Sequence, residues 1–226
     1  MLQLSVKGEK MPSSPIRKLT PYADKAKADG KKVYHLNIGQ PDVESPVSAL
    51  EAYHSLPYEV ISYTHSEGTP EYRKALSVYY KHRGYDVETN DIIVTNGGSE
   101  ALLFTFSVIA NPGDEIIIPE PFYANYNSFA CQSDVKIVPV RSTIENNFGL
   151  PPIASFEDKI TSKTKAILIC HPGNPTGYLY SEQELEQLKE LVLKHDLYLI
   201  SDEVYAEYLM MIDFTFFTAS STSSLT

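Results

Sequence analysis

Two adjacent carboxylates close an apolar run near the carboxyl end of the sequence. The run, residues 197–201, is typical of a buried strand, and Asp202 and Glu203 follow it directly. Removing a carboxylate from water costs free energy unless a cation or hydrogen-bond donors compensate for it. We therefore expect Asp202 to face a cation held at the end of this strand. Glu203 is expected to point elsewhere, as an acid at the start of a helix or on the surface.

The motif NGGSEALL, residues 96–103, predicts an anion site. Gly97, Gly98 and Ser99 precede an apolar helix, and the first amides of a helix have no partners within it. The positive end of the helix dipole adds to the attraction, so phosphate is the usual ligand of such a turn. The alternative is an ordinary strand-to-helix turn in which Ser99 is the N-cap.

Two further motifs supply an aromatic face and an amide. EPFYANY contains Phe122, Tyr123 and Tyr126, which stack on a planar ligand or pack in the core. HPGNPTG is a tight turn in which Asn174 offers both a donor and an acceptor. A plain turn is the alternative for this motif, and His171 is expected to be a loop residue rather than a catalyst.

Pyridoxal 5′-phosphate (PLP) would use all four motifs. It has a phosphate, a flat ring and a pyridine nitrogen, and a carboxylate beside that nitrogen makes the ring an electron sink. Asp202 is the candidate for this carboxylate, and Tyr205 is the candidate to hydrogen-bond the phenolic oxygen of the ring. A nucleotide-binding protein that uses the NGGSEA turn is an alternative, but the sequence has no Walker loop, no G-x-G-x-x-G motif and no zinc-ligand spacing.

The motifs follow the strands of a predicted α/β fold. Short apolar strands are expected at 92–95, 116–118, 135–140, 166–170 and 197–201, and helices at 68–84, 99–110, 121–133 and 181–195. This alternation indicates a three-layer, mostly parallel sheet covered by helices. Ligands of such sheets bind beyond the carboxyl ends of the strands, so we expect Ser99, Tyr123, Asn174 and Asp202 to surround one cavity.

The clearest predicted helix is SEQELEQLKELVLKH. Ser181 and Glu184 are expected to form a capping box at its start, and Glu190 and Lys194 an ion pair on its surface. The N-terminal third, by contrast, is rich in proline and is expected to be irregular up to the helix at 68–84.

The composition limits the classes of partner. The chain has 29 acidic and 19 basic residues, a formal net charge of −10, which argues against a nucleic-acid surface and against binding to an anionic membrane. It contains no apolar run of the roughly 20 residues that a membrane span needs, and its N-terminus lacks the apolar core of a signal peptide. Cys131 and Cys170 are expected to be free, buried thiols in a reducing cytoplasm.

Six motifs in order resemble the class I and II PLP-dependent aminotransferases, of the fold shared with aspartate aminotransferase. They are NIGQPDVESP, YTHSEGTPEYRKAL, VTNGGSEAL, NPGDEIIIPEPFY, HPGNPTG and SDEVY. The resemblance implies an N-terminal arm with part of a small domain at 1–45, a PLP-binding large domain at 46–208, and a divergent tail at 209–226. It also implies a homodimer in the cytoplasm.

The resemblance implies a role for each matching residue. Gly98, Ser99 and Glu100 would bind the cofactor phosphate, mainly through backbone amides, and Tyr123 would stack on the ring. Asn174 and Tyr205 would contact the phenolic oxygen, and Asp202 would pair with the ring nitrogen. Gly39, with Asn174, would seat the substrate carboxylate, and Tyr63 would reach the phosphate of the neighbouring subunit. A cis peptide is expected between Asn174 and Pro175.

The chain departs from the family at its carboxyl end. The family's catalytic lysine, which forms a Schiff base with the cofactor, follows the last matching strand, but no lysine or arginine occurs here after Lys194. The arginine that binds the substrate carboxylate in the family is missing too. No catalytic residue is therefore assigned, and the chain is expected to be an N-terminal fragment with a divergent tail. Lys189 and Lys194 are expected to lie on a helix outside the sheet, too far from the site to substitute.

Two functions follow from these observations. The first is amino transfer from an L-amino acid, such as aspartate or an aromatic amino acid, to a 2-oxo acid. The second is a catalytically inactive fragment that binds the cofactor or dimerises without turnover.

Overall fold

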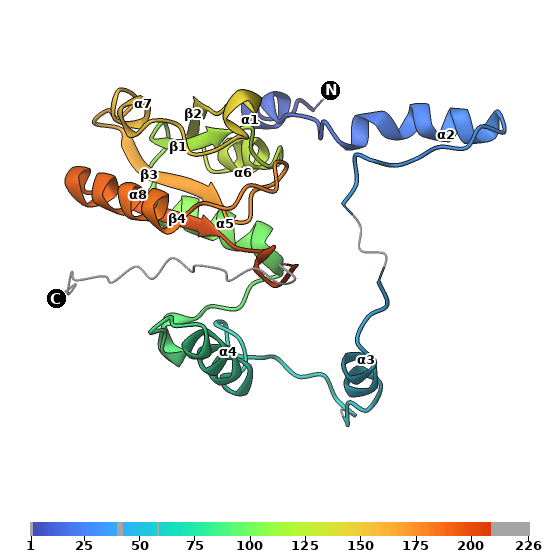
Figure 1. Ribbon diagram of the computed structural model, residues 1–226. Helices are drawn as coiled ribbons and strands as arrows, with labels where there is room; N and C mark the ends of the chain where they lie inside the picture. Colours follow the sequence, from blue (N-terminus) through green and yellow to red (C-terminus); the bar gives the residue numbers. More distant parts are fainter. Residues whose placement is uncertain (1, 40–42, 58, 209–226) are drawn as a thin grey trace.

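A four-stranded parallel sheet forms the centre of the molecule. The computed structural model describes residues 2–39, 43–57 and 59–208. The strands are β1 (Glu115–Glu120), β2 (Lys136–Arg141), β3 (Thr164–Cys170) and β4 (Tyr198–Asp202), in the order β2-β1-β3-β4. All three neighbouring pairs are parallel (Figure 1), which confirms the expected parallel α/β sheet.

Helices cover both faces of this sheet. On one face, α5 (Gly97–Ile109) and α6 (Tyr126–Gln132) pack against Ile116 and Ile118 of β1. On the other, α7 (Ile153–Glu157) and α8 (Glu182–His195) pack against Ile117 of the same strand. Successive side chains of a strand point to opposite faces, so the apolar run of β1 contributes to two cores. The expected three-layer arrangement is confirmed.

The predicted strand at 92–95 is absent from the sheet. Within this segment the amide of Val94 donates to the carbonyl of Glu67 at 2.9 Å, and Ile93 is 63% exposed. Its β-branched residues favour an extended backbone, but a strand also needs a neighbouring ladder, and none of the described strands provides one. The predicted helix at 121–133 is shorter than expected, because α6 begins only at Tyr126.

The N-terminal third is more helical than expected. It contains α1 (Val6–Lys10), α2 (Thr20–Ala28) and α3 (Val47–His54), none of which has a buried residue. The predicted helix at 68–84 is confirmed as α4 (Pro70–His82), and Gly84 follows it with a φ of +86°. Figure 1 shows α2 and α3 lying apart from the sheet. The short 3₁₀ helices η1–η4 are Arg17–Leu19, Thr89–Asp91, Ile144–Asn146 and Ala206–Tyr208.

The start of α8 has the expected capping box. The amide of Glu184 donates to Ser181 Oγ at 3.3 Å, and the amide of Ser181 donates to the Glu184 carboxylate at 2.7 Å. The expected ion pair on this helix is wrong, because Lys194 pairs with Glu157 of α7 at 2.5 Å and not with Glu190. The pair joins two neighbouring helices rather than two turns of one helix.

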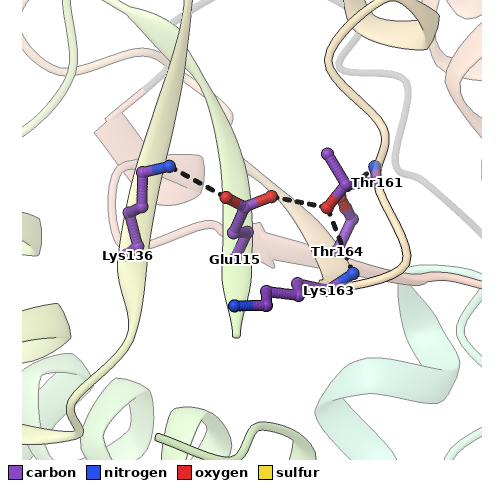
Figure 2. A network of polar contacts seen from close by, with 5 residues as sticks. All are labelled: Glu115, Lys136, Thr161, Lys163 and Thr164. Carbon is purple, nitrogen blue, oxygen red and sulfur yellow. Dashed lines mark hydrogen bonds and ion pairs between the residues drawn. The ribbon is translucent and has the colours of Figure 1, made fainter. Parts of the chain in front are cut away.

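A polar network lies at the amino ends of the strands, as Figure 2 shows. Glu115, only 7% exposed, accepts from Lys136 Nζ at 2.9 Å and from the Thr161 hydroxyl at 2.7 Å. The Thr161 amide donates to Thr164 Oγ1, and the Lys163 amide to Thr161 Oγ1. These hydrogen bonds hold the pKa of Glu115 below its usual range, the one from Lys136 having the largest effect. The buried carboxylate is therefore compensated by its partners.

The described residues contain neither a membrane-spanning helix nor a disulfide. No helix there combines the length and the apolar character needed to cross a bilayer. Cys131 and Cys170 are free thiols, as expected, but both are half-buried rather than fully buried. The predicted tail at 209–226 lies outside the described residues.

Candidate cofactor site

One cavity lies where the carboxyl ends of β3 and β4 meet the start of α5. Its volume is about 180 Å³. Ser99, Tyr123, Asn174 and Asp202 all line it, which confirms the expectation that they surround one cavity. The other lining residues are Gly98, Leu102, Phe129, Cys170, Val204 and Tyr205.

Asp202 is held in this cavity by neutral partners. The Tyr126 hydroxyl donates to Asp202 Oδ2 at 2.7 Å, and the Val204 amide donates to Oδ1 at 3.3 Å. Among the described residues, no lysine or arginine forms an ion pair with Asp202, and none lines the cavity. The carboxylate therefore presents its charge to a cavity with no cation from the described part of the chain.

Tyr126 is the partner of Asp202 that sequence reasoning missed. Its ring is fully buried between α6 and the sheet, so that only its hydroxyl reaches the strand end. Burial, followed by the nearby Cys170 and Asp202, raises the pKa of Tyr126 far above its usual range. Burial likewise raises the pKa of the Cys170 thiol to about 11, with Asp202 adding to the effect. Both groups stay protonated at neutral pH, and Tyr126 remains a donor to the carboxylate.

The start of α5 forms the opposite wall. Asn96, not Ser99, is the N-cap of this helix, so Ser99 lies in its first turn. Gly98 sits tightly against the segment after β4, since a Cβ there would lie 3.2 Å from Val204 Cγ1. The Glu100 carboxylate accepts from the Asn96 amide at 2.6 Å, which ties this side chain back to the start of the helix.

Asn174 and Tyr205 meet across the cavity. Asn174 Nδ2 donates to the Tyr205 hydroxyl at 3.0 Å. The Asn174–Pro175 peptide is cis, as expected. Burial raises the pKa of Tyr205, an effect that the hydrogen bond from Asn174 opposes. Because Tyr205 accepts the bond from Asn174, its own phenolic proton is not used in that bond.

Glu203 points away from the cavity, as expected, but it is not a surface acid. The Tyr85 hydroxyl donates to its Oε2 at 2.8 Å, and the Ser201 hydroxyl donates to its Oε1 at 2.9 Å. Burial raises the pKa of Glu203, which its hydrogen bonds oppose. The acid joins the end of β4 to the turn after α4. His171 is also more enclosed than expected: it is 1% exposed and its Nδ1 accepts from the Tyr180 amide.

A second cavity of about 660 Å³ adjoins the first. The two share Tyr123, Asn174 and Tyr205 as lining residues. Gly39 lines the second cavity, beside the cofactor candidates, whereas Tyr63 is fully exposed and lines neither cavity. The structure thus brings Gly39 together with the predicted site and leaves Tyr63 apart from it within one chain.

Comparisons with known proteins identify relatives of this arrangement. Residues 31–218 match the family described as aminotransferase class I and II. The chain is 36% identical to the asparagine–oxo-acid transaminase of Streptococcus mutans over 91% of this chain and 53% of that protein. It is also 36% identical to the aspartate aminotransferase of Bacillus subtilis, over 83% of this chain and 48% of that protein.

A solved structure shows the same fold. The aspartate aminotransferase from Thermus thermophilus with maleate superimposes with a TM-score of 0.88 at 32% identity, covering 96% of this chain and 57% of that one. The chain spans about half the length of the curated relatives it matches. The family match extends over most of the sequence and includes every motif that contributes to the cavity. The chain therefore belongs to the class I and II aminotransferases, a family that uses PLP as its cofactor.

Proposed function

We propose that the cavity around Asp202 holds PLP and serves amino transfer from an L-amino acid to a 2-oxo acid. Aspartate and aromatic amino acids are the proposed donors, and the names of the relatives from Bacillus subtilis and Thermus thermophilus support aspartate. The observation that carries the proposal is the Asp202 carboxylate, which faces a cavity lined by no basic side chain of the described residues.

The residues present fit the chemical parts of PLP. A protonated ring nitrogen would supply the cation that Asp202 lacks, and Tyr123 would offer its ring to the pyridine. The amides of Gly98, Ser99 and Glu100 would bind the phosphate at the positive end of α5.

Each of these residues would have its own part in the chemistry. When bound, PLP acts as an electron sink for negative charge at the α-carbon of the substrate. The charge of Asp202 would favour a proton on the ring nitrogen, and the apolar walls of Leu102, Phe129 and Val204 would strengthen that attraction. The Tyr205 hydroxyl, which accepts a hydrogen bond from Asn174, would donate its own proton to the phenolic oxygen of the cofactor ring.

Equilibrium dialysis tests the binding of the cofactor. Pyridoxine 5′-phosphate is the best probe, because it keeps the ring and phosphate of PLP but lacks the aldehyde that reacts with surface lysines. We expect one molecule bound per chain, and binding about tenfold weaker after Asp202→Asn. Asp158→Asn makes the same chemical change at an exposed position and should leave binding unchanged. No saturable binding to the unaltered chain would refute the proposal.

The second candidate function is cofactor binding without turnover. No lysine of the described residues lines either cavity, and the sequence has none after Lys194. Both lysines lie on α8, where Lys189 pairs with Glu186 of the same helix and Lys194 with Glu157 of α7. Without a lysine in the site, the chain lacks a base for the α-proton, a function typically worth about 10² to 10⁴ in rate.

An assay of amino transfer from aspartate or tyrosine to 2-oxoglutarate separates the two functions. We expect the 226-residue chain with PLP to show no turnover beyond that of free PLP. The aspartate aminotransferase of Bacillus subtilis is the positive control. Turnover, with PLP trapped by borohydride on any lysine of this chain, would establish the first function for the chain alone.

We further propose that two copies of the chain associate. Tyr63 is fully exposed, and Val60 and Ile61 beside it are also largely exposed, so this stretch has the apolar character of a contact surface. Tyr63 would then reach the phosphate of the partner copy. Sedimentation should give a dimer that Ile61→Glu weakens; a monomer at all concentrations would contradict this.

We also propose that the chain divides into an arm and a cofactor-binding unit, and that it resides in the cytoplasm. Residues 46–208 would form the PLP-binding unit, and residues 1–45 an arm that contributes Gly39 to the larger cavity. The free cysteines support a reducing compartment such as the cytoplasm.

A further inference from the structure

We propose that Arg17 binds a carboxylate of the amino-acid substrate and thereby helps to determine specificity. The inference rests on the proposed function, because it assigns a role to the cavity that adjoins the cofactor site. It gives the N-terminal segment, which sequence reasoning treated as an irregular arm, a place in substrate recognition.

Arg17 is the one charged side chain among the described residues that line the 660 Å³ cavity. The cavity continues from Tyr123, Asn174 and Tyr205, which it shares with the cofactor site. A ligand attached to the ring would therefore extend toward Arg17. The remaining lining residues are neutral: Ser14, Ile16, Thr20, Asn37, Ile38, Gly39, Asn125, Pro172, Gly173, Pro175, Gly177 and Tyr208.

The guanidinium group of Arg17 has no carboxylate partner in the described part of the chain. The hydrogen bonds of Arg17 in the described part of the chain are made by its backbone: its amide donates to Ser14 Oγ at 3.3 Å, and its carbonyl accepts from the Thr20 amide. The chain carries a formal net charge of −10, so acidic side chains are abundant elsewhere. A guanidinium group matches a carboxylate with two parallel hydrogen bonds, which makes this side chain suited to an anionic ligand.

Two sets of contacts keep Arg17 near the cavity. Asn37 Nδ2 donates to the carbonyl of Ile16 at 3.2 Å, which joins the segment before Arg17 to the segment that carries Gly39. Further upstream, Lys7 Nζ donates to the carbonyl of Gln132 at 3.0 Å and thereby attaches α1 to α6. Figure 1 shows α1 beside α6 at the edge of the sheet.

The substrate, rather than the cofactor, is the source of the anion. The cofactor phosphate would lie at the start of α5, in the smaller cavity, and Arg17 does not line that cavity. The groups that remain anionic are the α-carboxylate of an amino acid and, in an acidic amino acid, the side-chain carboxylate. Arg17 would bind a carboxylate group, which both of these positions of the substrate present.

Stable conjugates of cofactor and substrate test this without a catalytic lysine. In phosphopyridoxyl amino acids, a reduced carbon–nitrogen bond already joins the two parts. Equilibrium dialysis compares phosphopyridoxyl-aspartate, phosphopyridoxyl-alanine and phosphopyridoxyl-propylamine, which carry two, one and no carboxylates. The variants are Arg17→Gln, Arg17→Lys and, as the matched control, Lys18→Gln, which changes an exposed cation that lines neither cavity.

We expect Arg17→Gln to weaken binding of the aspartate conjugate about tenfold, or about 1.4 kcal/mol. Binding of the propylamine conjugate should change less than twofold, Arg17→Lys should be intermediate, and Lys18→Gln should have no effect. A loss that extends to the alanine conjugate assigns Arg17 to the α-carboxylate. A loss confined to the aspartate conjugate assigns it to the side-chain carboxylate.

Two results would overturn the inference alone. One is equal binding of the aspartate conjugate by the unaltered chain and Arg17→Gln. The other is an equal loss for the propylamine conjugate, which would show a general disturbance of the site. If the unaltered chain binds none of the three conjugates, the proposed cofactor site is itself wrong and the inference falls with it.

Discussion

The hydrogen bond from Tyr126 to Asp202 keeps the central carboxylate of the site in place. Tyr126→Phe removes this donor and leaves a fully buried ring of almost the same shape. We expect the free energy of unfolding to fall by about 1 kcal/mol, since the carboxylate loses one of its partners. Affinity for pyridoxine 5′-phosphate should fall about threefold to tenfold, because the carboxylate is less well oriented; urea titration and dialysis measure the two effects.

The control for this substitution is Tyr22→Phe, at a tyrosine on α2 that is 75% exposed. It should change neither quantity. If Tyr126→Phe binds the probe as tightly as the unaltered chain, the hydrogen bond has no part in the site.

The sequence identifies Asp202 but not its partner, and the reason is geometric. EPFYANY contains three aromatic residues, and spacing alone does not decide which ring points at the strand end. The start of α6 at Tyr126, rather than near Pro121, directs that hydroxyl toward Asp202. Glu203 is a similar case, because its partner Tyr85 lies more than a hundred residues away in the sequence.

The network around Glu115 stabilises the sheet at the end opposite the cofactor site. Glu115→Gln should lower the free energy of unfolding by about 1 to 2 kcal/mol, since it removes charged hydrogen bonds. The pKa of Glu115 lies below its ordinary value of 4.5 in the folded chain. The stability that the ionised Glu115 carboxylate contributes is therefore fully present above pH 4.5. It is lost as the pH falls through the pKa of the folded state.

Urea titrations at pH 7 and pH 3 test this expectation. The difference between Glu115→Gln and the unaltered chain should shrink at pH 3, whereas affinity for pyridoxine 5′-phosphate at pH 7 should not change. Glu51→Gln, at an exposed position on α3, is the control. An undiminished difference at pH 3 would mean that the ionised carboxylate is not the source of the stability.

The capping box of α8 contributes measurably to the free energy of unfolding. Ser181→Ala removes the oxygen that accepts from the Glu184 amide and should cost about 1 kcal/mol of unfolding free energy. Ser181→Thr keeps the hydroxyl and should cost much less. If the alanine and threonine variants unfold at the same urea concentration, the cap does not stabilise this helix.

Local sequence patterns predict two kinds of element well. These are helices whose ends are capped by nearby side chains, and strands that are apolar on both faces because they lie inside the sheet. The capping box fixes the start of α8, and apolar runs locate β1, β3 and β4. The segment at 92–95 has the same local character but no partner strand in the described part of the chain. Lys7 joins α1 to α6, and Asn37 bonds to Ile16 just before η1. No sequence pattern around these two residues indicates their distant partners.

Ligand binding should stabilise the whole molecule if the cavity exists only in the folded chain. A ligand present at 100 times its dissociation constant raises the free energy of unfolding by about 2.7 kcal/mol. We expect pyridoxine 5′-phosphate to produce this increase in urea titrations. At the same concentration Asp202→Asn should gain less, because the ligand is then closer to its weakened dissociation constant. An equal gain in both would place the binding away from Asp202.

The two ends of the sheet serve different purposes. Glu115 and its partners stabilise the amino ends of the strands, whereas Asp202, Asn174 and Ser99 meet at the carboxyl ends. The rule for ligands of parallel sheets predicts this division from the sequence of elements. It does not predict the larger cavity, which requires Arg17 and Gly39 to come together with the strand ends through tertiary contacts.

A crystal structure of the chain with pyridoxine 5′-phosphate is the most direct test of the cofactor site. We predict that the ring nitrogen lies within hydrogen-bonding distance of Asp202, with the phosphate at the amides of Gly98, Ser99 and Glu100 and the ring against Tyr123. A ligand bound outside this cavity, with Asp202 paired to a cation of the protein instead, would contradict the account.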